Sequence, residues 1–172
     1  MYYRVEEDTL LLLDNISPRG KVLEVGAGSG YISLELAKRG FDVTATDIDE
    51  DAISHMEYVS KMEKLNIRIV KSDLFENIEG EFDTIIFNPP YLPGNITQDI
   101  AIYGGMMGQE IVERFLEQAY DHLSKNGTIY VIFSSYNDIE KLRKKFYFYS
   151  FKEIARKNFF FHSIYVYRLE KK

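Results

Sequence analysis

Residues 22–30 read Val22-Leu23-Glu24-Val25-Gly26-Ala27-Gly28-Ser29-Gly30, an apolar run that passes directly into alternating glycines. A helical pattern follows from Tyr31, so a strand, a glycine loop and a helix come in immediate succession. Glycines adopt backbone torsions that other residues resist, and they let a ligand approach the main chain closely. The stretch therefore predicts a binding site for a nucleoside-bearing cofactor at the end of a buried strand.

Apolar runs and helical stretches alternate on both sides of this loop. We expect strands at 22–25, 42–46, 67–70, 82–87 and 128–133, and helices at 31–39, 50–65, 109–123 and about 137–145. This alternation predicts an α/β fold with a mainly parallel sheet and helices on both faces. Two aromatic strands at 146–151 and 159–168 have a short connection and predict an antiparallel hairpin at the edge of the sheet. A short leading helix is expected at about 6–14.

The composition is that of a folded protein, and we expect a single domain over residues 1–172, with 45% hydrophobic and 28% charged residues. With 0 Cys there is no thiolate nucleophile and no thiolate-bound metal, and the 3 His show no ligand spacing, so we assign no metal. No apolar run approaches the roughly 20 residues of a membrane span. Because the first residues are acidic, unlike a signal peptide, we expect a cytoplasmic protein.

Acidic residues follow two further expected strands. Asp47 closes the second strand, 21 residues after Gly26, where a carboxylate can accept hydrogen bonds from both hydroxyls of an adenosine ribose. Asp73 follows the third strand at the next position of the same edge, within reach of an adenine amino group. Structural alternatives are a helix capping box over residues 73–76 and a simple turn at Gly30. The spacing of a dinucleotide site would place its third glycine at position 31, which is Tyr31, and this disfavours a nicotinamide oxidoreductase.

The expected strand at 82–87 runs directly into Asn88-Pro89-Pro90-Tyr91. Two prolines alone would make a rigid turn, but a turn does not explain the flanking Asn and Tyr. An amide nitrogen is a poor nucleophile because its lone pair is delocalised into the carbonyl. The Asn88 side-chain oxygen and the Pro89 carbonyl can each accept one hydrogen of an NH₂ group, and Tyr91 offers a flat face for stacking. We predict these as the catalytic residues, with no single ionising group among them.

With this segment the chain resembles the class I S-adenosylmethionine-dependent methyltransferases that act on planar amino groups, which have a Rossmann-like seven-stranded sheet. Residues 7–14 and 103–110 are similar to the HemK group of glutamine methyltransferases, most closely its short archaeal and eukaryotic branch. That branch modifies the glutamine of the Gly-Gly-Gln motif in class I peptide-chain release factors. The resemblance implies S-adenosylmethionine as the cofactor and a release factor as the substrate.

The same resemblance implies a set of cofactor contacts: Thr9, Glu24, Gly26, Gly28, Asp47, Asp73, Leu74 and Asn88. Structural alternatives exist for two of them, since Thr9 can start the leading helix and Leu74 can be core. Glu24 lies inside an apolar strand, where a carboxylate without a partner is costly. The ammonium of the methionine portion, or nearby backbone N–H groups, could satisfy it.

About 20 residues precede the first strand, so we expect the separate substrate-binding domain of bacterial HemK proteins to be missing. The loop at 92–108 is then a candidate substrate clamp, with a disordered connector as the alternative. The short branch often works with a small zinc-binding activator subunit. Because unpaired backbone groups of an edge strand invite strand addition, we expect docking at residues 67–70.

Charge is distributed unevenly along the chain, and the basic C-terminal part is consistent with functions other than glutamine methylation. Residues 141–172 hold 10 Lys/Arg against 2 Asp/Glu, which leaves 11 against 25 in residues 1–140. A uniformly basic footprint is absent, but the basic and aromatic tail resembles a surface that stacks bases and binds phosphates. The main alternative is therefore a DNA or RNA amino-methyltransferase. A further alternative is a non-catalytic cofactor-binding subunit that stabilises a partner.

Overall fold

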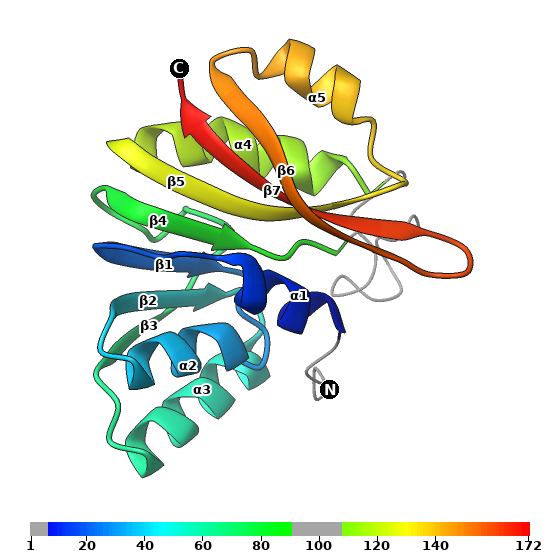
Figure 1. Ribbon diagram of the computed structural model, residues 1–172. Coiled ribbons are helices and arrows are strands. Elements are labelled where there is room, and N and C mark those ends of the chain that lie inside the picture. Colours follow the sequence, from blue (N-terminus) through cyan, green and yellow to red (C-terminus); the bar gives the residue numbers. More distant parts are fainter. Residues whose placement is uncertain (1–6, 91–107) are drawn as a thin grey trace.

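The computed structural model describes residues 7–90 and 108–172 (Figure 1). The strands in this part of the chain are β1 (Lys21–Val25), β2 (Asp42–Asp47), β3 (Ile67–Lys71), β4 (Phe82–Phe87), β5 (Leu123–Ser134), β6 (Tyr149–Asn158) and β7 (Ser163–Lys171). The helices are α1 (Glu7–Asn15), α2 (Tyr31–Lys38), α3 (Glu50–Met62), α4 (Glu110–His122) and α5 (Ile139–Lys145). None of these helices is long and apolar enough to cross a membrane.

The strands form one sheet in the order β3-β2-β1-β4-β5-β7-β6. Strands β1 to β5 are parallel, whereas β7 is antiparallel to both β5 and β6. The expected parallel sheet and terminal antiparallel hairpin are therefore confirmed, and β3 is an outer strand as expected. The carboxyl ends of β1 to β5 lie at the same end of the sheet, which we call its carboxyl edge to distinguish it from the outer strands β3 and β6. Since the strand order reverses beside β1, this edge is where α/β sheets of this kind bind ligands.

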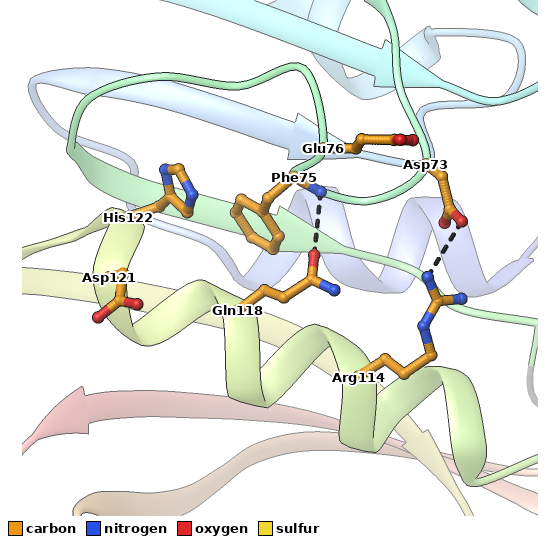
Figure 2. A pocket seen from close by; sticks show the side chains of 7 residues that line it. All are labelled: Asp73, Phe75, Glu76, Arg114, Gln118, Asp121 and His122. Carbon is orange, nitrogen blue, oxygen red and sulfur yellow. Dashed lines mark hydrogen bonds and ion pairs between the residues drawn. The ribbon is translucent and has the colours of Figure 1, made fainter.

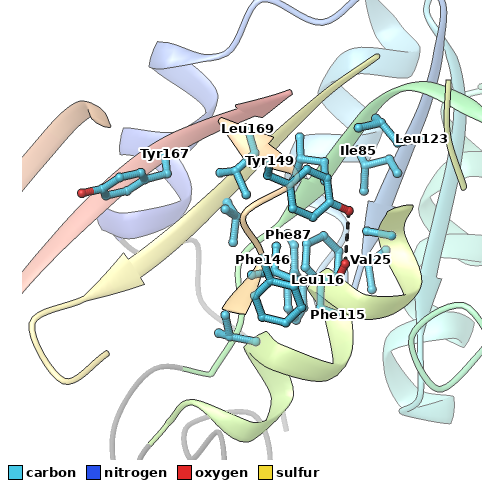
Figure 3. Packing of buried hydrophobic residues seen from close by; sticks show 14 of the residues in the cluster. Val25, Ile85, Phe87, Phe115, Leu116, Leu123, Phe146, Tyr149, Tyr167 and Leu169 are labelled. Carbon is cyan, nitrogen blue, oxygen red and sulfur yellow. Dashed lines mark hydrogen bonds between the residues drawn. The ribbon is translucent and has the colours of Figure 1, made fainter. Parts of the chain in front are cut away.

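Two apolar clusters cover the two faces of the sheet. Alternate residues of one strand enter opposite clusters, as Val131 and Ile132 of β5 do. On one face the sheet packs against α4 and α5 (Figure 3). On the other face it packs against α1 and α2, with Met56 of α3 beside the glycine loop. Helices on both faces are thus confirmed.

The largest departures from the expected elements lie in the last third of the chain. The predicted strand at 146–151 is wrong in its first half, because Phe146 ends α5 and packs into the core. The backbone N–H of Tyr149 donates to the Phe146 carbonyl at 3.0 Å, which closes a turn before β6 begins. Strand β6 then continues through residues 152–157, four of which are charged, because an outer strand keeps one edge and part of its faces in water.

Candidate active site

The glycine loop between β1 and α2 has left-handed backbone torsions at each of its glycines. The φ angles are +62° at Gly26, +57° at Gly28 and +75° at Gly30. A Cβ at Gly30 would lie 2.4 Å from Met56 Cγ, so glycine is required for space as well as for torsion. A Cβ at Gly26 would lie 3.5 Å from the Phe87 ring, which places the loop beside the residue that precedes Asn88.

Asp47 binds the glycine loop from the end of β2. Its Oδ2 accepts a hydrogen bond from the Gly28 N–H at 2.8 Å, and its Oδ1 accepts one from the Asp49 N–H at 2.9 Å. The Ala27 N–H donates to the Thr46 carbonyl at 2.7 Å and joins the loop to the same strand. Each carboxylate oxygen has two lone pairs, so these bonds leave Asp47 able to accept from a further donor.

Glu24 of β1 is buried and turned toward α2. Its Oε2 accepts hydrogen bonds from the Ser33 N–H at 2.9 Å and from the Ser33 hydroxyl. Of the two kinds of partner expected for Glu24, a backbone N–H is the one observed. Burial raises the pKa of Glu24 to about 7; the Ser33 hydrogen bonds oppose this rise, and the charge of Asp47 adds to it. Glu24 thereby satisfies one of the N–H groups that the first turn of α2 leaves open.

The segment after β3 forms turns, so the capping box considered for residues 73–76 does not occur. The Asp73 carboxylate instead pairs with the guanidinium of Arg114 on α4 at 3.0 Å, and both side chains are partly exposed (Figure 2). Leu74 is buried in the core with an unusual φ of +50°. An open pocket of about 470 Å³ between this segment and α4 is lined by Asp73, Phe75, Glu76, Arg114, Gln118, Asp121 and His122.

Asn88 follows β4 and is held from α1. Its Nδ2 donates to Asp8 Oδ2 at 3.1 Å, while Asp8 Oδ1 accepts the Thr9 N–H at 2.7 Å. An ionised carboxylate only accepts hydrogen bonds, so Asp8 fixes which way the Asn88 amide is turned. Asn88 Oδ1 is buried and has no donor among the residues that the structure describes. This oxygen is therefore a buried acceptor ready for a hydrogen-bond donor from a ligand.

The structure brings several of the predicted residues together at the carboxyl edge. Gly28 contacts Asp47, and the helix turn of Thr9 contacts Asn88 through Asp8, whereas the Asp73 carboxylate is directed to α4. Pro89 is buried next to Asn88. Tyr91 and all of the predicted clamp except Gly108 lie outside the described residues.

Two residues at this edge were not singled out from the sequence. Asp8 was part of the quoted leading segment, but nothing local shows that an acidic residue in a leading helix reaches the end of the fourth strand. Ser33 could have been found from the sequence. It lies in the first turn of a helix, whose N–H groups have no partner within the helix, and that helix follows the strand that contains Glu24.

Comparisons with known proteins agree with this geometry. The family model described as "Methyltransferase small domain" matches residues 2–162. A Methanocaldococcus jannaschii protein, whose name proposes protein N5-glutamine methyltransferase activity, is 39% identical over 142 residues, which are 77% of this chain and 72% of that protein. The release factor glutamine methyltransferase of Lactococcus lactis is 30% identical over 71% of this chain. The match spans only 50% of that bacterial enzyme's own length.

Two other similarities bear on substrate and assembly. The ribosomal RNA small subunit methyltransferase C of Haemophilus influenzae is 30% identical over 88% of this chain, but the match covers 44% of that enzyme. Among solved structures, the E. cuniculi Mtq2-Trm112 complex, described as responsible for methylation of the eRF1 translation termination factor, matches with a TM-score of 0.80 and 26% identity. That match covers 99% of both chains. The chain therefore belongs to the methyltransferase small domain family, as the resemblance to class I methyltransferases of the HemK group predicted.

Proposed function

We propose that this methyltransferase transfers a methyl group from S-adenosylmethionine to the side-chain amide nitrogen of the glutamine in the Gly-Gly-Gln motif of a peptide-chain release factor. The observation that carries the proposal is the buried acceptor Asn88 Oδ1, which Asp8 turns away from itself. The names of the relatives support a glutamine as the target. Because release factors act on ribosomes, we place the reaction in the cytoplasm.

The glycine loop and its neighbours fit the cofactor. Gly26, Gly28 and Gly30 have no side chain, so a ligand can contact the backbone of the loop directly. Asp47 can accept further hydrogen bonds from ribose hydroxyls. The Asp47 carboxylate also adds negative charge beside the loop, which favours a cationic ligand. When bound, S-adenosylmethionine supplies an electrophilic methyl group on a positively charged sulfur.

Further roles in cofactor binding are proposed for Thr9 and Leu74 as direct contacts, and for Glu24 as an indirect one. Thr9 lies on α1 one residue from the carboxylate that holds Asn88. Glu24 acts through Ser33, because it fixes the start of α2 directly behind the glycine loop. Leu74 lies in the buried cluster after β3, and a strained left-handed torsion of this kind often occurs at ligand sites.

Asn88 and Pro89 position the target amide. Asn88 Oδ1 accepts one hydrogen of the target NH₂, and the Pro89 carbonyl accepts the other, so the nitrogen is fixed and gains electron density as positive charge develops. Tyr91 would stack on the planar group. Alignment of a nucleophile for in-line displacement can lower a barrier by about 7–11 kcal/mol. The proton is then lost to water or to a nearby carbonyl, so no side chain here needs to change its own charge.

We also propose that a small activator subunit, which the family resemblance implies to be zinc-binding, docks on β3. This strand is an outer strand of the sheet, so its outward backbone groups can pair with a strand from another chain. The similar Mtq2 structure is described as a complex with Trm112.

The rival function is methylation of an exocyclic amine in RNA. The similarity to ribosomal RNA methyltransferases favours it, and so does the basic tail of 10 Lys/Arg in residues 141–172. An Asn88 acceptor suits a nucleobase amine as well as an amide, so the site alone does not choose between the two substrates.

One experiment separates the functions. The protein, with any copurifying subunit, is incubated with labelled S-adenosylmethionine, a candidate release factor and total RNA, and mass spectrometry locates the label. We expect label on the glutamine side chain, and we expect Asn88→Ala to abolish it while circular dichroism shows that the variant is still folded. Label only on RNA bases would replace the proposal with the rival. If no label transfers to either substrate although the donor binds, the protein is a non-catalytic cofactor-binding subunit.

A further inference from the structure

The turn between β6 and β7 exposes two adjacent aromatic rings. Phe160 is 93% exposed and Phe161 is 84% exposed, the highest values among the large apolar side chains of the described residues. Their ring centroids lie 4.8 Å apart at an interplanar angle of 79°. Single exposed apolar side chains are common in folded proteins, but two adjacent and fully exposed Phe rings suggest a contact surface. We refer to this pair as the aromatic tip.

The aromatic tip lies at the same edge of the sheet as Asn88. Because β7 is antiparallel to β5, the turn that precedes β7 falls at the carboxyl end of β5 (Figure 1). At the end of β6, the Lys157 ammonium pairs with Glu7 of α1 at 3.0 Å. The next residue of α1, Asp8, holds Asn88. A large substrate whose glutamine reaches Asn88 therefore meets the tip on the same side of the molecule.

The residues at the base of the tip contact one another and the end of β5. The Phe159 and His162 rings stack at 4.8 Å, and the Phe159 N–H donates to the His162 carbonyl at 2.8 Å. The Ser135 N–H donates to the Ser163 carbonyl at 2.9 Å and joins the turn to the end of β5. These contacts join the turn to the end of β5 and do not involve the Phe160 and Phe161 rings, so both rings are left to bind a partner.

The chemistry of the tip fits a protein better than a nucleic acid. Surfaces that bind single-stranded nucleic acid combine stacking rings with cations that are free to contact phosphates. The nearest cations are already paired, Arg156 with Glu153 at 2.6 Å and Lys157 with Glu7 at 3.0 Å. Residues 154–169 contain no Asp or Glu, and the tip itself carries no charged side chain. These features match an apolar groove on a protein better than a phosphate backbone.

We infer that the aromatic tip docks into an apolar groove of the release factor that carries the target glutamine. The inference rests on the proposed function and deepens it, because it gives the chain a second contact with the whole substrate outside the site at Asn88. The tip supplies affinity for the folded protein, and it contributes nothing to the reaction at the amide.

The test compares a double variant, Phe160→Ser with Phe161→Ser, against wild type on two substrates. With the whole release factor we expect KM to rise about tenfold or more, the size typical of buried aromatic anchors, with kcat unchanged. With a short Gly-Gly-Gln peptide we expect the kinetics, and also the donor affinity, to be unchanged. A Phe160→Leu, Phe161→Leu variant should recover most of the loss, because the knob stays apolar. The matched control is Tyr147→Ser, which removes a ring that is 69% exposed at the opposite edge of the sheet.

Each other outcome overturns the docking. An unchanged KM for the whole release factor would do so, and so would an equal loss with the peptide, which would place the effect at the active site. A loss of RNA methylation alone would assign the tip to nucleic acid, and a change in sedimentation would assign it to a second copy of the chain. If the wild-type protein transfers no label to the release factor, the proposed function is wrong. If it does transfer label but the double variant has the same KM as wild type, only the docking is wrong.

Discussion

Two buried carboxylates at the carboxyl edge of the sheet differ in what they hold. Asp8 on α1 accepts from the Asn88 amide, while Glu24 in β1 accepts from Ser33 at the start of α2. Asn88 is a side chain whose Oδ1 is proposed to accept from the target amide, whereas Ser33 belongs to the first turn of a helix. We therefore expect loss of Asp8 to appear in the rate of methyl transfer, and changes at Glu24 to appear in folding stability.

The largest effect is expected for Asp8→Ala. Without this acceptor the Asn88 amide can turn over and present its NH₂ to the target NH₂, so two donors face each other. We expect kcat to fall about 10²- to 10³-fold, the range seen when one oriented polar group of an active site is lost, with KM changed much less. Steady-state kinetics on the release factor measures both constants.

The matched control is Glu7→Ala, which removes an acidic residue from the same helix turn without touching Asn88. It should change kcat less than about twofold, because its ion pair with Lys157 is exposed. Asp8→Asn should fall between the two variants, because an amide at position 8 can accept from Asn88 but no longer forces its orientation. A normal kcat for Asp8→Ala would show that Asn88 is oriented by something else.

The second effect is a pH dependence of stability that arises at Glu24. Its pKa is about 7 in the folded protein against 4.5 ordinarily, so between these values the folded state binds a proton that the unfolded state lacks. The stabilisation is complete below pH 4.5 and is lost as pH rises to about 7. Over that window the free energy of unfolding should fall by about 3 kcal/mol from this group.

The measurement is urea unfolding of wild type and Glu24→Gln at several pH values from 5 to 8. The amide keeps the shape of Glu24 and still accepts from Ser33, but it does not titrate. The free energy of unfolding of wild type should therefore increase relative to that of Glu24→Gln as pH falls. A difference that stays constant over this range would mean that Glu24 has the same pKa in both states.

A third and smaller effect concerns Ser33→Ala. This change removes the hydroxyl that is bonded to Glu24 but keeps the backbone donor, so we expect a loss of about 1 kcal/mol, the size typical of one hydrogen bond inside a protein. The rate of methyl transfer at saturating substrate should stay within about twofold. If kcat falls as far as in Asp8→Ala, the contact between Ser33 and Glu24 also supports the rate of methyl transfer, and the proposed difference between Asp8 and Glu24 is wrong.

Sequence patterns predicted most of the fold because local rules decide it. The strand at 82–87 has its expected bounds, and the glycine loop follows its strand, since hydrophobic runs and glycine torsions are readable within a few residues. Of the candidate site, the sequence pattern could indicate only those residues that directly follow a strand, such as Gly26 and Asn88. The Asp8–Asn88 contact spans 80 positions and depends on how α1 packs across the sheet, which no local pattern specifies.

Asp73 shows the same limit, because its place after β3 was predictable whereas its pairing with Arg114 was not. Strand order could bring Asp73 to the carboxyl edge, but the ion pair depends on the turn of α4 that faces it.

The smallest effect is expected for Arg114→Gln, which frees Asp73 from this ion pair. Both side chains are partly exposed, so the pair adds at most about 0.5 kcal/mol and the melting temperature should hardly change. If Asp73 accepts from the adenine amino group, as its place after β3 predicts, the guanidinium competes for its carboxylate, and removal of the guanidinium should tighten donor binding about twofold. Calorimetry of donor binding checks this, with Asp73→Asn as the reference, which should weaken binding whatever stands at position 114. Equal donor affinity in all of these proteins would remove Asp73 from the cofactor site and leave only its ion pair with Arg114.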